Sequence, residues 1–263
     1  MHRLLLLSVL VLVNSVAVAQ TNYVDWAAAG RPAFALQVAP QPSAVAGGLT
    51  VFADLASFQA ATNGGFTVET FDGGATPAGG VNTCTEPVSS LSNDACFAPG
   101  NLIPGFSMTS SSGGGIVVLG DGFLGQATAV VGANQFVDTT SVAFGPAVTA
   151  VAFDGLIGAP AAGDITVTAL DAGAAVIGSV TVTTTSTTAT EFIGFTSLIP
   201  IASITIDGVG GSGELLDNLQ FGVPAAAVAA LPVPATGSWA VGSLVGLLLL
   251  LGAGWLFTRT RVL

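Results

Sequence analysis

The middle of the chain is a succession of short apolar runs that alternate with polar residues and end at turn-forming residues. Runs rich in Val, Ile, Thr and Phe with a period of two place one face of a strand on a core and the other in solvent. Asp-Gly pairs at Asp72, Asp121, Asp154 and Asp207 supply turns between such runs. We predict strands over residues 66–71, 116–119, 127–131, 148–153, 165–170, 176–183, 191–195, 201–206 and 215–221.

Many short strands at this spacing predict an all-β fold, a two-sheet antiparallel sandwich that is jelly-roll-like, over residues 50–222. This region is long enough for one domain with a substantial core. One short helix is predicted at residues 55–62, because Asp54 can cap its start and the pair Asn63-Gly64 can end it.

The N-terminal residues predict export. Arg3 precedes a short apolar run, and the small residues Ala17-Val18-Ala19 follow it. This order is typical of a cleaved secretory signal peptide, here residues 1–19. Residues 20–49 are rich in Ala, Pro and Gly, and we expect a flexible lead-in there.

The C-terminal residues predict membrane insertion, at least transiently. Residues 223–238 form a Pro/Ala-rich spacer, and residues 239–257 carry no charge over a length that can cross a bilayer as a helix. Arg259 and Arg261 follow and are expected on the cytoplasmic side, which leaves the body facing outward. Residues 239–263 are therefore predicted to be a transmembrane helix with a basic tail.

A Val-Pro pair followed by a tryptophan (Val233, Pro234, Trp239), an apolar helix and the basic Arg259 and Arg261 stand in a recognisable order. This order resembles the C-terminal sorting domains of exported bacterial proteins, the PEP-CTERM class and especially its IPTL-CTERM relative. The resemblance implies that signal peptidase and a membrane-embedded sorting enzyme process the chain. Two alternatives stay open: a permanent anchor, and a sortase signal, since V-P-A-T-G at residues 233–237 is one residue from L-P-x-T-G.

The body also carries short motifs: FQAAT in the expected helix, ETFDG in the first expected strand, and LLDNLQFG just before the spacer. They resemble the β-sandwich modules of exported proteins that bear PEP-CTERM tails. The resemblance implies a jelly-roll fold of unassigned function, often compared with carbohydrate-binding modules, and exopolysaccharide as a partner.

Composition excludes several functions. Between the signal and the apolar run, one basic residue, Arg31, stands against fifteen acidic residues, a formal charge of −14. Nucleic acid is therefore excluded as a partner, because phosphate contacts need Lys and Arg. The chain has no lysine, and its one histidine, His2, leaves with the signal. A Ser-His-Asp triad, a His-based zinc site and a Schiff-base lysine are thus excluded from the exported part.

Carboxylates remain, and they allow two uses. Glu69, Glu191 and Glu214 are candidates for the acid pair of a glycosidase, although nothing in the sequence fixes their separation.

The second use is a structural Ca²⁺ site. If the first and last strands are neighbours, oxygens of Glu69, Asp72, Asp217 and Asn218 can converge on such an ion. The alternative, which we weigh more heavily, is that Asp72 and Asn218 are turn residues and Glu69 lies on a solvated strand face. No other cofactor is expected.

Cys84 and Cys96 lie in a loop-like stretch of an exported chain, so a local disulfide is expected between them. Sugar binding usually needs exposed aromatic rings. The aromatic residues Tyr23 and Trp26 lie in the expected lead-in, whereas the phenylalanines are expected in the core. The sequence therefore predicts a non-enzymatic exported surface or extracellular-matrix protein. A carbohydrate-binding, lectin-like module is the alternative, and a carboxylate-dependent glycosidase is the third reading.

Overall fold

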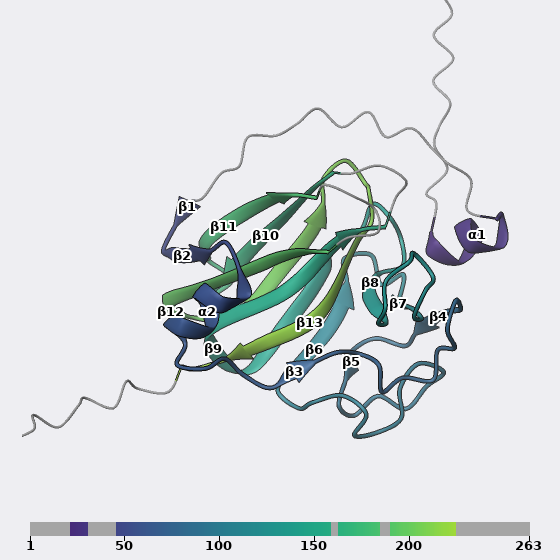
Figure 1. Ribbon diagram of the computed structural model, residues 1–263, viewed down its shortest axis with the longest axis horizontal. Coiled ribbons are helices and arrows are strands. Elements are labelled where there is room, and N and C mark those ends of the chain that lie inside the picture. Colours follow the sequence, from purple (N-terminus) through teal and green to yellow (C-terminus); the bar gives the residue numbers. More distant parts are fainter. Residues whose placement is uncertain (1–21, 31–45, 159–162, 185–189, 225–263) are drawn as a thin grey trace, which may run out of the picture. The chain divides into compact units, whose positions relative to one another are not determined.

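The computed structural model describes residues 22–30, 46–158, 163–184 and 190–224 (Figure 1). Antiparallel strands dominate these residues, with two short helices, which confirms the all-β prediction in its main point. The elements are α1 (Tyr23–Ala28), β1 (Ala46–Gly47), β2 (Leu49–Phe52), α2 (Leu55–Ala61), β3 (Val68–Glu69), β4 (Val81–Cys84), β5 (Val88–Ser89), β6 (Phe106–Ser110), β7 (Ile116–Leu119), β8 (Val130–Ala133), β9 (Thr140–Ile157), β10 (Asp164–Leu170), β11 (Val176–Thr183), β12 (Glu191–Gly208) and β13 (Glu214–Gly222).

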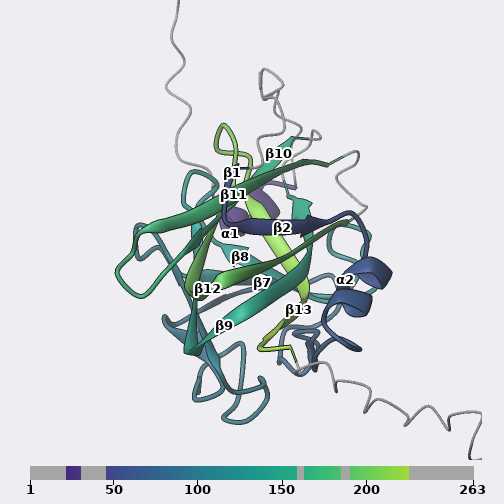
Figure 2. The same cartoon turned by 90° about the vertical axis from the view of Figure 1, so that its left-hand side faces the viewer.

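The strand pairings fall into two groups that share the long strands β9 and β12 (Figure 2). The first group runs in the order β5, β6, first half of β9, second half of β12, β10, β11 and β1. The second group runs in the order β2, first half of β12, second half of β9, β13, β8, β7 and β4. Strand β3 also pairs with β13. Side chains of both groups meet in one apolar core, so the body is β-sandwich-like.

The two groups form one continuous hydrogen-bonded network, where separate sheets were expected, because β9 and β12 run through both. Their ladder loses its register between Thr196 and Ser203 on β12. The facing part of β9 contains Gly145 and Pro146, and proline has no N–H for a ladder. Both strands turn there from one group into the other. The separate strands predicted at 191–195 and 201–206 are therefore one strand, β12.

Several boundaries differ from the prediction for local reasons. The strand predicted at 66–71 contracts to β3, because Phe71 has a positive φ of 57° and its N–H donates to the Glu69 carboxylate. The strand predicted at 127–131 begins later, at Val130, because the N–H of Ala129 donates to Asp72. The Asp154-Gly155 pair lies inside β9, so the turn predicted there is wrong.

Helix α2 confirms the predicted helix and its cap. Asp54 accepts a hydrogen bond from the N–H of Ser57 at 2.8 Å. Phe58 is fully buried and packs against an aromatic and alanine surface of the second strand group, made of Phe52, Phe66, Phe192, Ala150 and Ala152.

Helix α1 was missed, because the sequence predicted a flexible lead-in over residues 20–49 and one helix in the β-sandwich body. Asn22 caps α1 by accepting from the N–H of Asp25, and Tyr23 and Trp26 lie one turn apart. Both are buried against a cluster of β7, β8 and β13 residues with Phe123 and Phe136. Burial on the body stabilises a helix that is too short to be stable alone.

The predicted signal peptide, the sorting residues Val233, Pro234, Trp239, Arg259 and Arg261, and the predicted transmembrane helix lie outside the described residues. Among the helices that the structure does describe, none has the length and apolarity to span a bilayer.

Candidate functional site

The candidate site consists of two open hollows on either side of a wall of aromatic rings, which we together call the groove. The first, of about 360 Å³, is lined by Phe66, Thr67, Ile103, Pro104 and Phe221. The second, of about 310 Å³, lies against the start of β6 and the first half of β9. It is lined by Ser89, Ser90, Leu91, Gly105, Phe106, Ser107, Ala143, Phe144 and Gly145. No charged side chain lines either hollow.

Three aromatic rings form the wall that the two hollows share. The Phe221 ring lies 5.7 Å from that of Phe106 and 5.2 Å from that of Phe144, measured between centroids. Gly105 lets this wall close up, because a Cβ there would lie 3.1 Å from the Phe221 ring and the residue has a φ of 107°. Phe66 and Phe221 stay partly exposed and face the first hollow. The groove thus combines aromatic surface with neutral hydroxyl groups.

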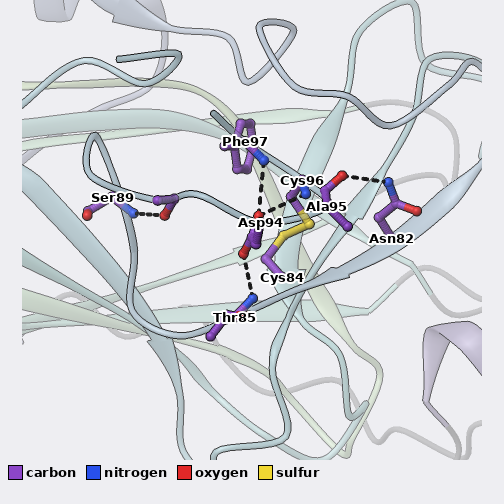
Figure 3. The surroundings of a disulfide bond; sticks show 9 residues. Asn82, Cys84, Thr85, Ser89, Asp94, Ala95, Cys96 and Phe97 are labelled. Atoms are coloured by element: carbon purple, nitrogen blue, oxygen red, sulfur yellow. Dashed lines mark hydrogen bonds between the residues drawn. A yellow bond between two sulfur atoms is a disulfide. The ribbon is translucent and has the colours of Figure 1, made fainter. Parts of the chain in front are cut away.

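The disulfide fixes the rim that carries Ser89, Ser90 and Leu91. Cys84 and Cys96 are bonded, as predicted, and their Cα atoms lie 5.5 Å apart (Figure 3). The loop between them is braced by Asp94, whose carboxylate accepts from the N–H groups of Thr85, Cys96 and Phe97. Burial acts to raise the pKa of Asp94, but these three hydrogen bonds outweigh it and hold the pKa below its ordinary value.

Glu69 positions the opposite wall. Its side chain is buried, and its two oxygens accept from the N–H groups of Phe71 at 2.8 Å and Ile103 at 2.7 Å. It therefore ties the segment with Ile103 and Pro104 to β3. The solvated strand face that we weighed for Glu69 is wrong. The sequence made the Glu69 carboxylate a candidate for metal binding and for catalysis. In the structure, both of its oxygens accept hydrogen bonds from backbone N–H groups.

The predicted Ca²⁺ ligands come together only in part. β3 pairs with β13, so the first and last predicted strands are neighbours, as expected. The Asp72 charge acts on Asp217, and Asn218 donates to Asp154, a residue that the sequence analysis had assigned to a turn. The oxygens of this group already accept hydrogen bonds, since Thr128 and the N–H of Asn218 donate to Asp217.

Within the described ranges, no set of three or more His, Cys, Asp or Glu side chains is arranged to hold a metal ion. Glu69 takes its hydrogen bonds from Phe71 and Ile103, and Asp217 takes its own from Thr128 and Asn218. The Ca²⁺ site stays a prediction. The pKa of Asp217 is raised to about 6, chiefly by burial; the hydrogen bonds from Thr128 and Asn218 lower it, and the charges of Asp72 and Asp154 add to the rise.

Glu214 lies in the core below α1. It is fully buried, accepts a hydrogen bond from the Thr140 hydroxyl at 2.6 Å, and has a pKa raised to about 8, chiefly by burial. The third glycosidase candidate, Glu191, is partly exposed at the start of β12. With Glu69 and Glu214 buried, the three candidates present no pair of solvent-facing carboxyl groups.

The aromatic residues of the expected lead-in do not form a sugar platform, because Tyr23 and Trp26 are buried under α1. The groove residues Ile103, Pro104 and Gly105 were missed by sequence reasoning, since they lie in a stretch without periodicity. The sequence signal that pointed toward this region was the expected local disulfide, which indicates that the neighbouring loop has a fixed conformation.

No protein-family model and no curated protein matches the chain. Among solved structures, the chain is similar to two variants of CBM29-2, a family 29 carbohydrate-binding module, one of them complexed with mannohexaose. The identities are 13% and 11%, the TM-score is 0.33 for both, and the matches cover 55% of this chain and 93% and 92% of those chains.

A third similar structure is the enzymatically active domain of bacteriophage CBA120 tailspike protein 4, at 12% identity and a TM-score of 0.27. That match covers 45% of this chain and 19% of the other.

Proposed function

We propose that the jelly-roll-like body is a non-enzymatic module that binds a neutral polysaccharide on an exported surface or matrix protein. The observation that carries the proposal is the groove built from Phe66, Phe221 and Phe106 beside the hydroxyls of Ser89 and Ser107. The C–H faces of sugar rings pack on aromatic rings, and serine hydroxyls both donate to and accept from sugar hydroxyls. An apolar hollow with a few polar groups is the usual form of a binding site.

Charge supports the choice of a neutral glycan. The exported part carries a formal charge of −14, while every side chain lining the groove is uncharged. An anionic polysaccharide would be repelled by the body and would find no cation in the groove. Export, processing through the C-terminal residues and display outward remain part of the proposal, supported by the sequence patterns of both ends.

The test is a glycan array with the natural full-length chain, followed by calorimetry on each glycan bound. Thr67→Glu places a charge on the exposed rim of the groove without removing core surface, and it is expected to lower the affinity at least about tenfold, about 1.4 kcal/mol. Phe66→Ala removes a ring and is expected to do the same. The matched control is Thr190→Glu, exposed just before β12 and away from the lining of both hollows.

Equal affinities of Thr67→Glu and the control variant would place binding elsewhere. Binding only to anionic glycans would contradict the proposal. Hydrolysis of any bound glycan, abolished by Glu191→Gln, would support the glycosidase reading instead.

A further inference from the structure

Four large apolar side chains project into solvent at the end of the body where the described chain stops. Leu198 is fully exposed, and the exposed fractions of Val176, Val223 and Ile199 are 65%, 64% and 47%. We call these four residues the bend patch, since Leu198 and Ile199 form the bend of β12. These side chains do not pack into the apolar core. Clustered exposed apolar residues mark a surface that contacts another molecule or a membrane.

The contacts around the bend bring the four residues to the same end of the body. Leu198 lines a hollow of about 330 Å³ together with Pro224, the neighbour of Val223. A Cβ on Gly48 would lie 3.9 Å from Ile199 and 3.5 Å from Ile177, the neighbour of Val176. Ser197 braces the bend, because its hydroxyl accepts from the N–H of Ile199 at 3.0 Å. The bend therefore has a defined conformation, and its apolar side chains point into solvent.

The surroundings of the bend patch are neutral. The hollow beside Leu198 is lined by Gly48, Thr50, Ala61, Thr149, Thr196, Ser197 and Pro224, none of them charged. The charged residue of the nearby β10–β11 turn is Asp171, whose carboxylate accepts from the N–H groups of Gly173 and Ala175. A neutral apolar surface on an otherwise acidic body suits an uncharged apolar partner.

The sequence beyond Pro224 identifies that partner. Residues 225–238 are a tether of 14 residues, which spans at most roughly 50 Å, and the uncharged run of residues 239–257 follows directly. If that run enters a bilayer, the tether holds the bend patch close to the same membrane at high effective concentration. Each apolar side chain that enters the interface then gains the free energy of its burial, about 25 cal/mol per Å².

We infer that the bend patch is a membrane-contacting surface that seats the body on a neutral lipid bilayer. The inference rests on the proposed membrane insertion of the C-terminal residues. It also states what that proposal leaves open, namely which end of the body faces the membrane. The partner is the zwitterionic lipid surface, because the acidic body is repelled by anionic lipids.

The experiment places a fluorescent label at the bend in the full-length chain, reconstituted into phosphatidylcholine vesicles. Leu198→Cys and Val137→Cys are each labelled with the polarity-sensitive dye NBD, and the native cysteines do not react because they form the disulfide. Val137 is 53% exposed and lies beside Gly211 in the β12–β13 connection, at the other end of the second half of β12 from its bend. Lipids that carry a nitroxide at the headgroup are then added as quenchers.

The expected result is a blue-shifted emission at position 198 that the nitroxide lipids remove for the most part, with little change at position 137. Leu198→Cys in a chain that also carries Ile199→Ser and Val176→Ser should lose most of this quenching. If quenching is equal at 198 and 137 in a chain that resists extraction by alkaline carbonate, the bend patch does not contact the membrane. That result would overturn this inference and leave membrane insertion of the C-terminal residues standing.

A chain that carbonate extracts from the vesicles would overturn membrane insertion, and this inference with it. A blue shift at 198 without lipid quenching would also overturn it, because the patch would then be covered by protein, such as a second copy of the chain. Glycan binding in solution is unaffected by any of these outcomes and is tested separately.

Discussion

The phenol oxygen of Tyr23 occupies the space beside Gly158, where a Cβ atom would lie 2.1 Å from it. Gly213 borders the same space, since a Cβ there would lie 2.7 Å from that oxygen. The hydroxyl is buried without a hydrogen-bond partner, and its pKa is raised by burial and then by the charge of Glu214. Two glycines therefore make the pocket in which α1 anchors to the body.

This fit predicts opposite effects for two small changes. Tyr23→Phe removes an unsatisfied buried hydroxyl and is expected to stabilise the fold by about 1 kcal/mol. Gly158→Ala forces a methyl group onto the ring and is expected to cost about 1–3 kcal/mol. Urea unfolding monitored by tryptophan fluorescence measures both, with Val24→Ala on the exposed side of α1 as control. A destabilised Tyr23→Phe would show that the hydroxyl has a partner.

The buried carboxyl of Glu214 predicts lower stability in alkali. Its pKa is raised from 4.5 to about 8 in the folded protein, so the folded state keeps a proton that the unfolded state loses. The free energy of unfolding therefore falls as the pH rises from 4.5 to 8, by at most about 1.4 kcal/mol per pH unit. Asp217 adds to the fall only below about pH 6.

Thermal unfolding between pH 6 and pH 8 isolates Glu214. The natural protein should lose several degrees over this interval, and Glu214→Gln should flatten the profile. Glu191→Gln, at a partly exposed position, should keep the slope of the natural chain. A slope that survives in Glu214→Gln would assign the titration to another group.

Opening the disulfide is expected to act on both stability and binding. The bond closes a loop with a sequence separation of 12, so Cys84→Ser with Cys96→Ser should cost about 3 kcal/mol. The loop also carries Ser89 and Ser90, so glycan affinity should fall even at temperatures where the variant remains folded. Circular dichroism and calorimetry at 10 °C separate the two effects. Unchanged affinity would remove this loop from the binding site.

The loss of the Glu69 carboxylate is expected to destabilise the fold. Glu69→Ala leaves the N–H groups of Phe71 and Ile103 without their acceptor, at about 1–3 kcal/mol for each unsatisfied group. Glu69→Gln keeps one acceptor oxygen and should recover part of the loss. Chemical denaturation of both variants, with Asp121→Ala in the exposed connection between β7 and β8 as control, measures this. Equal stability of Glu69→Ala and the control would contradict the bracing role.

Local patterns identified much of the strand content. β7 and β11 match the predicted residues, β10 begins one residue before its predicted start, and β13 extends one residue beyond its prediction at each end. The joined halves of β12 could not be predicted, because Pro200 reads as a break and only an exposed bend tolerates it there. Helix α1 could not be predicted either, since its stability comes from burying Tyr23 and Trp26 on distant strands.

The groove was beyond sequence reasoning for the same physical reason. Phe66 and Phe221 read as ordinary core residues of the first and last strands, and Ile103 as loop. Their meeting depends on the pairing of β3 with β13 and on a hydrogen bond from Ile103 to Glu69 across 34 positions of sequence. Neither relationship leaves a periodic trace in the chain.

Strand β13 is the last element before the tether, and it pairs with β9 along both of its ends, from Glu214 to Asp217 and from Gln220 to Gly222. A pulling force along this strand acts on those hydrogen bonds in shear. The bonds then share the force and must break together, not one after another. The residues that follow β13 are thus joined to the body through a connection that resists pulling along the chain.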